Sequence, residues 1–103
     1  MDIDNDLLYL AETDEEYADK ESWLTGLKET MKHHKGMWVV QSKSSVSKAQ
    51  EEYYATPEYK KQVGIITEAV KQVNTLKNKR ATAILRIDVW RTLEASRRKG
   101  NIQ

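Results

Sequence analysis

The pattern of apolar positions in the first third of the chain predicts a helix from Thr13 to about His34. Thr13 followed by Glu16 has the spacing of a capping box, in which each side chain satisfies the backbone N–H of the other residue. Apolar residues then recur at intervals of three and four, which places them on one helix face. Gly36 is expected to stop the helix, because glycine tolerates the left-handed conformation that follows a last turn. The apolar face carries Leu24, Leu27 and Met31, with Trp23 beside it and Tyr17 one heptad before Leu24.

Residues 37–54 predict a connector followed by a short second helix. The run MWVV at 37–40 is too short for its apolar character to distinguish a buried strand from part of a helix, and we expect an extended or irregular connector. Serines follow, and serine is a preferred N-cap because its oxygen accepts a hydrogen bond from a free backbone N–H. We therefore expect the second helix to run from about Ser45 to Tyr54.

A third helix is predicted to begin at Pro57. Thr56 can cap it, and proline is favoured at the first helical position. Glu58 then favours the positive end of the helix dipole. A break near 74–78 would give a hairpin, whereas an unbroken helix over about 57–99 would hold roughly forty residues and span ~60 Å. We favour the single helix, because the stretch KNKRATA has no glycine or proline and is rich in good helix formers.

The third helix carries a heptad pattern, in which apolar residues alternate at spacings of three and four. Lys77 and Arg80 interrupt this seam before apolar residues return. A helix of this length cannot bury its seam against so short a chain, so we expect it to pack against copies of itself in a coiled coil or ring. The sequence thus predicts an all-α fold whose single helical domain, 22–103, forms a homo-oligomer. The expected oligomerisation residues are Val63, Ile66, Val70, Val73, Ile84, Ile87 and Trp90.

Charge is divided unevenly along the chain. Residues 1–21 carry nine acids and one base, a net charge of 1 − 9 = −8, whereas residues 22–103 carry sixteen bases and seven acids, a net charge of 16 − 7 = +9. One interpretation is a basic body that binds a polyanion, with an acidic N-terminal segment (1–21) that binds a basic partner or folds back to compete for the same surface. The other interpretation is a solvated acidic tail beside an ordinary lysine-rich surface.

Composition argues against several classes of protein. The chain has no cysteine for a disulfide framework or a thiolate metal site, and no apolar run approaches the ~18 residues of a membrane span. Its acidic N-terminus does not resemble a secretory signal, so we expect a cytoplasmic protein. His33 and His34 are adjacent and would point about 100° apart on a helix, so they cannot hold one metal ion together. Without a phosphate loop, a nucleophile elbow or a catalytic cysteine, we expect no enzyme, no cofactor and no metal.

Basic residues recur beside aromatic residues in two parts of the chain. Single-stranded nucleic acid is bound by this combination, because cations neutralise phosphates and aromatic faces stack on bases. Alternatively, the aromatics belong to the core at helix junctions and the bases form a solvated face. For the aromatics we favour the core. The first group comprises Lys48, Tyr53, Tyr54, Tyr59, Lys60 and Lys61, and the second comprises Arg86, Trp90, Arg91, Arg97, Arg98 and Lys99.

Several short motifs follow one another in order: an acidic segment, a tyrosine followed by WL, the motif K-A-x-x-x-Y-Y, and a long helix with a tryptophan and a basic R-x-K-G end. The residues concerned are Tyr17, Trp23, Leu24, Lys48, Ala49, Tyr53, Tyr54, Trp90, Arg97, Lys99 and Gly100. This order, over roughly residues 17–100, resembles that of the UvsY-type recombination mediator proteins of T4-like phages. The chain departs from that family in two respects: Gln50 stands where members carry a base, and the segment after the tyrosine pair is shorter.

The resemblance implies a non-enzymatic accessory protein that assembles as a homo-oligomer through its C-terminal helices, in the cytoplasm of a bacterial host. It would bind single-stranded DNA and help to load a recombinase onto strands covered by single-strand binding protein. An oligomer multiplies weak basic patches through avidity, so a modest charge per protomer suffices. The expected DNA-binding residues are Lys48, Lys60, Lys61, Tyr53, Tyr54, Arg97, Arg98 and Lys99.

The alternative function is that of a small helical adaptor or inhibitor that binds a host protein, with the acidic segment acting as a nucleic-acid mimic. The dependence of oligonucleotide binding on salt concentration distinguishes the two functions. A DNA-binding protein binds an unstructured oligonucleotide with an affinity that falls steeply as the salt concentration rises, whereas a mimic does not bind the oligonucleotide at any salt concentration.

Overall fold

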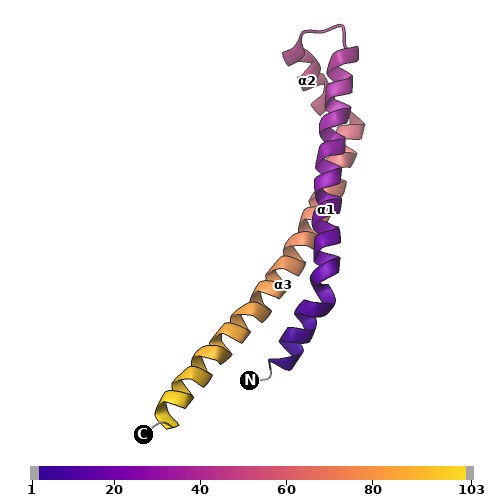
Figure 1. The fold of residues 1–103 in the computed structure, drawn as a ribbon. Coiled ribbons are helices and arrows are strands. Elements are labelled where there is room, and N and C mark those ends of the chain that lie inside the picture. The colour runs from indigo at the N-terminus through magenta and orange to yellow at the C-terminus, as the bar shows by residue number, and fades with distance from the viewer. Residues whose placement is uncertain (1–2, 102–103) are drawn as a thin grey trace. The chain divides into compact units, whose positions relative to one another are not determined.

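The protein folds into helices. The computed structural model describes residues 3–101, and within them it has three helices and no strand (Figure 1). Helix α1 spans Asp4–Gln41, α2 spans Val46–Tyr54 and α3 spans Pro57–Asn101. The prediction of an all-α fold with a short middle helix and one long C-terminal helix is confirmed. None of the described helices combines the length and apolar character that a membrane crossing requires.

The chain forms two compact units. The first unit combines residues up to Ala18 with residues from Asn74 onward, and the second unit holds Asp19–Val73. Within each unit a stretch of α1 lies beside a stretch of α3 that runs in the opposite direction, and the second unit also holds α2 (Figure 1). Each unit is therefore built on an antiparallel helix pair.

Helix α1 begins at Asp4 rather than at Thr13, so the predicted capping box is wrong. Thr13 lies inside the helix, where its hydroxyl donates a hydrogen bond to the backbone carbonyl oxygen of Tyr9 at 2.7 Å. Such a bond to the residue four positions earlier is an alternative to capping for a threonine. Asp4 and Asp6 occupy the first turn, where carboxylates are stabilised by the positive end of the helix dipole. The acidic segment of the sequence therefore starts α1.

Helix α1 also ends later than predicted. Gly36 lies within it without a positive φ, so the predicted stop at this residue is wrong. Residues 37–40 are helical, so the predicted connector is wrong as well. Trp38 gives the physical reason, because its ring packs against the ring of Tyr53 on α2, with the ring centres 6.3 Å apart. Continuing the helix brings this tryptophan to an aromatic partner.

The short-range signals at the two ends of α2 are confirmed. Ser45 caps α2, and its side chain accepts a hydrogen bond from the backbone N–H of Lys48. The hydroxyl of Thr56 donates to the carbonyl oxygen of Tyr53 at 2.6 Å and accepts from the N–H of Tyr59 at 3.2 Å, which links α2 to the start of α3. Helix α3 then continues without a break through KNKRATA, as predicted.

Helix α3 presents a heptad seam to α1, displaced in part from the predicted one. Val63 and Ile84, which were expected in the seam, are 38% and 48% exposed. The residue just before each of them is more buried: Gln62 is partly buried and Ala83 is buried. The buried seam residues are Ala69, Val73, Leu76, Ala83 and Ile87, with Ile66 and Arg80 partly buried at the same spacing.

Hydrogen bonds between α1 and α3 fix the register of the two helices in each unit. In the second unit, Lys20 Nζ donates to Gln72 Oε1 at 2.9 Å, which sets Leu24 level with Ala69. In the first unit, Arg80 Nη1 donates to Thr13 Oγ1 at 2.7 Å. The apolar face predicted for α1 is confirmed by its burial: Tyr17, Leu24, Leu27 and Met31 are all partly buried.

The seam of α3 is covered by α1 of the same chain, which removes the premise from which a homo-oligomer was inferred. Helix α1 has 38 residues, so it is long enough to accompany much of the 45-residue α3. Val73 and Ile87, two of the expected oligomerisation residues, are buried within the units. Of the other expected residues, Ile66, Val70 and Trp90 are partly buried. A homo-oligomer therefore stays a prediction that rests on the exposed Val63 and Ile84 and on the resemblance.

Candidate nucleic-acid interface

An aromatic cluster gathers where the C-terminal part of α1 meets α2 and the start of α3. Tyr53 lies 5.5 Å from Tyr59, ring centre to ring centre, in an edge-on arrangement, and Tyr54 lies 5.0 Å from Tyr59. Trp38 contacts Tyr53 from α1. All four rings belong to the second unit. Three helices thus contribute to one cluster. The sequence analysis grouped its three tyrosines but did not include Trp38.

Tyr53 is the buried member of the cluster. It is 4% exposed, and its hydroxyl donates to Gln62 Oε1 at 3.1 Å. Burial raises the pKa of Tyr53, and the neighbouring Tyr59 raises it further, while Lys35 opposes the shift. Tyr53 therefore offers no free ring face to a base. For this residue the structure agrees with the core interpretation.

The raised pKa of Tyr53 predicts a loss of stability at alkaline pH. The unfolded chain releases the tyrosine proton near pH 10.0, whereas the folded chain holds it to a higher pH. The contribution of the protonated Tyr53 side chain to the free energy of unfolding is therefore fully present below about pH 10. It is lost as the pH rises through the pKa that Tyr53 has in the folded chain. We expect Tyr53→Phe to lower the free energy of unfolding at pH 7 by about 1 kcal/mol, through loss of the bond to Gln62.

The midpoint of thermal unfolding should fall less between pH 9 and pH 11 in Tyr53→Phe than in the unchanged chain. Tyr54→Phe is the matched control, because it removes a neighbouring hydroxyl and leaves Tyr53 in place. A Tyr53→Phe variant that loses stability at alkaline pH as steeply as the unchanged chain would contradict the assignment.

Tyr54 is the accessible member of the cluster, at 46% exposed. Lys35 Nζ donates to the Tyr54 hydroxyl at 2.6 Å and lies 4.9 Å from the centre of its ring. The short bond to the hydroxyl and the longer distance to the ring centre show that the ammonium lies near the hydroxyl edge rather than over the middle of the ring. Tyr54 is therefore an exposed aromatic ring with a cation at its edge.

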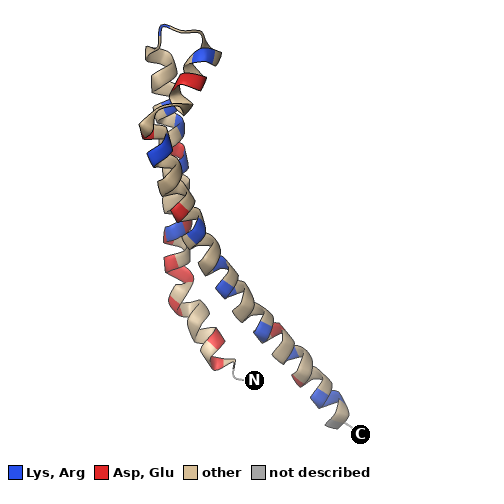
Figure 2. Ribbon diagram, turned by 180° about the vertical axis from the view of Figure 1, so that it is seen from behind, with Lys and Arg blue, Asp and Glu red and all other residues tan. Residues whose placement is uncertain are grey.

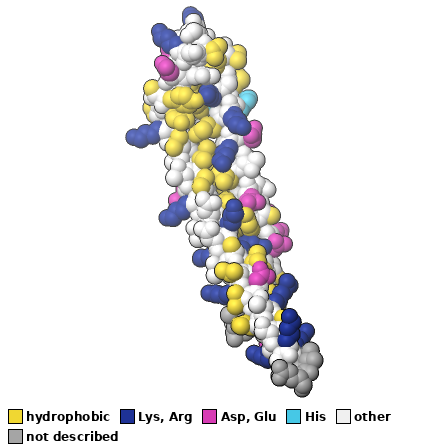
Figure 3. Space-filling view, turned by 90° about the vertical axis from the view of Figure 1, so that its left-hand side faces the viewer, with side chains coloured by type: hydrophobic (Ala, Val, Ile, Leu, Met, Phe, Trp, Pro, Cys, Tyr) yellow, Lys and Arg dark blue, Asp and Glu magenta, His cyan; other side chains and the backbone are white. Residues whose placement is uncertain are grey.

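A hollow beside Tyr54 brings a second cation into the same region. Lys60, in the first turns of α3, lines it together with Tyr54 and Tyr59. In the region of α2, Figure 3 shows hydrophobic side chains gathered with Lys and Arg side chains around them. The remaining lining residues are Ala55, Thr56, Pro57 and Val63. The hollow combines an aromatic wall with a cation, as a stacked nucleotide requires.

A second hollow in this unit has a different character. It is lined by Trp38 and Tyr53 together with His34 and Gln62, whose side chains hydrogen-bond to each other, and by Glu58. No lysine or arginine is among its lining residues, and Glu58 would repel a phosphate. The hollow beside Tyr54 is therefore the better candidate for an anionic strand.

The other predicted DNA-binding residues lie apart from this hollow or in the other unit. Lys48 is exposed in the first turn of α2, away from Tyr54 in the last, and Lys61 is exposed on α3. Arg97, Arg98 and Lys99 are exposed near the end of α3 and belong to the first unit. The structure thus brings Lys60 and Tyr54 together, and none of the other predicted cations lines this hollow.

Lys35 was missed by sequence reasoning, although a signal for it exists. It follows Met31 by four residues and precedes Trp38 by three, so it continues the apolar face of α1. The expected helix end near His34 removed it from consideration. Extending the helix through residues 37–40 would have placed Lys35 and Trp38 on the same face as Met31.

Comparisons of the chain with protein-family models, with curated proteins and with solved structures gave no match. Among the described residues, no group of three or more histidine, cysteine, aspartate or glutamate side chains is arranged to hold a metal ion.

Proposed function

We propose that the protein binds single-stranded DNA as a non-enzymatic accessory protein. The observation that supports this most is the hollow at the start of α3, where the exposed ring of Tyr54 is accompanied by Lys35 and Lys60. A base that stacks on an exposed aromatic ring gains about 1 to 3 kcal/mol, and nearby ammonium groups neutralise the flanking phosphates. A single strand is favoured over a duplex, because only unpaired bases present a free face to the ring.

The wider part of the proposal follows the resemblance to recombination mediators. The chain would act as a homo-oligomer that holds a strand and helps to load a recombinase onto it in the presence of single-strand binding protein. The second unit has only a small positive charge, with nine bases and seven acids over residues 19–73, a net of 9 − 7 = +2. Several copies on one strand would supply the affinity that one copy lacks.

The test is the affinity for a fluorescent oligothymidylate, measured by anisotropy across a range of salt concentrations. In Lys35→Ala/Lys60→Ala, which removes the two cations beside Tyr54, we expect the slope of log affinity against log salt to fall by about 1.4, because each lost phosphate contact on a single strand removes about 0.7. Near 0.1 M salt the affinity should drop at least tenfold, with the mass from light scattering unchanged.

The matched control is Lys28→Ala/Lys71→Ala, which removes the same charge from exposed positions of the same unit. We expect it to retain most of the affinity. Equal losses in the two double variants would mean that binding is a general attraction without a site at the joint. An unchanged chain that fails to bind at low salt would overturn the proposed function.

The alternative function, binding of a host protein through the acidic segment, requires carboxylates that are available to a partner. Asp6 and Asp14 already form ion pairs with Arg86 and Arg80 of the same chain, each at 3.2 Å. Glu12, Glu15 and Glu16 of the same segment are exposed and remain available to such a partner. The oligonucleotide titration separates the two functions directly.

A further inference from the structure

The first unit joins the most acidic stretch of the chain to the most basic one. Residues 1–18 carry seven acids and no base, a net charge of 0 − 7 = −7, and residues 74–103 carry eight bases and two acids, a net charge of 8 − 2 = +6. In Figure 2, acidic residues follow one another along the N-terminal part of α1, and basic residues along the C-terminal part of α3. The two charges nearly cancel within the unit.

The bases of this stretch are also arranged around the seam. Taking Arg80 and Ile87 as equivalent positions of the heptad, seven of the eight bases fall at the seam positions or at the positions that flank them. Only Lys99 falls outside. The seven are Lys77, Lys79, Arg80, Arg86, Arg91, Arg97 and Arg98. Arg80 is partly buried in the seam, whereas the other six side chains are exposed along its border.

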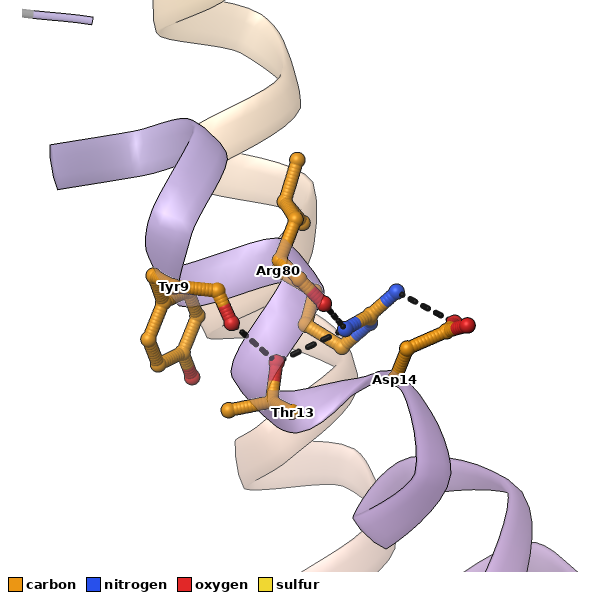
Figure 4. Close-up of polar contacts among 5 residues, drawn as sticks. Tyr9, Thr13, Asp14 and Arg80 are labelled. Atoms are coloured by element: carbon orange, nitrogen blue, oxygen red, sulfur yellow. Dashed lines mark hydrogen bonds and ion pairs between the residues drawn. The ribbon is translucent and has the colours of Figure 1, made fainter. Parts of the chain in front are cut away.

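Among the bases of α3, Arg80 makes the closest contacts with α1, which Figure 4 shows. Its guanidinium donates to the carbonyl oxygen of Leu10 at 2.9 Å, to Thr13 Oγ1 at 2.7 Å and to Asp14 Oδ1 at 3.2 Å. The ring of Tyr17 lies 5.4 Å away. With a side chain only 14% exposed, Arg80 is withdrawn from any ligand in solution while α1 stays in place.

Arg86 is held more loosely. Its guanidinium pairs with Asp6 at 3.2 Å, but its side chain remains 58% exposed. The Asp6 side chain is only 11% exposed, so the pair is buried on its acidic side and open to solvent at the guanidinium, where another anion can approach. A polyanion, which presents many charges at once, can therefore compete with the carboxylates of α1 for the bases of α3.

We propose that the N-terminal acidic stretch of α1, residues 4–18, is a built-in competitor that engages Arg80 and Arg86 of α3 and limits the access of a nucleic-acid strand to these two bases. The inference rests on the proposed function. The covered and uncovered forms of α3 are two states of one equilibrium, and a strand that binds the uncovered form shifts the population toward it. Salt weakens the acid–base contacts within the chain and the strand contacts together, so substitutions test the proposal more sharply than salt does.

The experiment compares two double variants with the same change of charge. Asp6→Asn/Asp14→Asn removes the carboxylates that pair with α3, whereas Glu12→Gln/Glu15→Gln removes two exposed carboxylates of the same helix that have no place in the seam. In anisotropy titrations with oligothymidylate, we expect the first variant to bind at least fivefold more tightly than the second. Equal gains would show a general effect of net charge and would overturn the proposal.

A second measurement uses the unchanged chain and guards against a variant that folds poorly. Hydrogen exchange of the backbone amides of residues 4–18 is followed by mass spectrometry with and without oligothymidylate. We expect faster exchange in this stretch when the strand is bound, because α1 loses its contacts with α3. Unchanged or slower exchange with the strand bound would overturn the competitor and leave the proposed function intact. A lack of binding in every chain would overturn both.

Discussion

Ala69→Asp is expected to lower the free energy of unfolding by about 3 kcal/mol or more, because it places a carboxylate in the seam between α1 and α3. Ala69 is fully buried, at 0% exposed, and the bond between Lys20 and Gln72 sets it level with Leu24. For a chain of this size, the midpoint of thermal unfolding should fall by more than about 12 °C.

Thr67→Asp is the matched control for this substitution. Thr67 lies two residues earlier on α3 and is exposed, so aspartate there does not bury its charge. Threonine and aspartate have similar helix propensities, so the control leaves out only the cost of replacing alanine, which is up to about 0.7 kcal/mol. We expect the midpoint of this control, followed by circular dichroism, to stay within a few degrees of the unchanged chain, since exposed substitutions usually change stability by less than about 0.5 kcal/mol. Comparable losses in the two variants would contradict the position of Ala69 in the seam.

Arg80→Ala should have the second-largest effect, a loss of about 2 to 3 kcal/mol in the free energy of unfolding. The substitution removes three hydrogen bonds from a side chain that is only 14% exposed, together with its contact with the ring of Tyr17. Asp14, whose side chain is 81% exposed, returns to water at little cost. The loss therefore comes from the missing bonds and from the space that alanine leaves.

Arg80→Met separates these two causes. Methionine fills much of the space but makes none of the hydrogen bonds, and the Thr13 hydroxyl keeps its bond to the carbonyl oxygen of Tyr9. Replacing a buried charged group by an apolar one of similar volume is often tolerated, so we expect about half the loss seen with alanine. Denaturant unfolding of the variants measures both values. An Arg80→Ala variant as stable as the unchanged chain would show that this network does not hold the seam.

The location of the candidate site could be predicted from the sequence, but which of its two adjacent tyrosines is exposed could not. The pattern of tyrosines and lysines around Pro57 marked the right joint between helices. It did not distinguish Tyr53 from Tyr54, because adjacent residues of the same type carry the same local signal. The structure separates them: Tyr53 faces Trp38 and is buried, whereas Tyr54 remains accessible. Lys35 joins the site from α1, at a separation of 19 residues from Tyr54, which no local pattern encodes.

The seam of α3 shows a second kind of ambiguity. A stripe through Val63, Val70 and Ile84 and a stripe through Ala69 and Ala83 both satisfy a spacing of three and four. Valine and isoleucine carry a stronger hydrophobic signal than alanine, so the sequence favoured the first stripe. Close packing against the larger residues of α1 favours the small alanines of the second stripe. This packing effect depends on the arrangement of both helices, so the sequence of α3 alone does not contain it.

The sequence by itself determined the features that depend on neighbours along the chain: the cap at Ser45, the start of α3 after Thr56 and the absence of a break through KNKRATA. Tertiary structure alone decided how far α1 extends. The capping box at Thr13 and the stop at Gly36 are weak local preferences. They are outweighed when α3 offers hydrogen bonds such as those of Arg80 and α2 offers a ring such as that of Tyr53, because burial against other helices contributes more than a single cap.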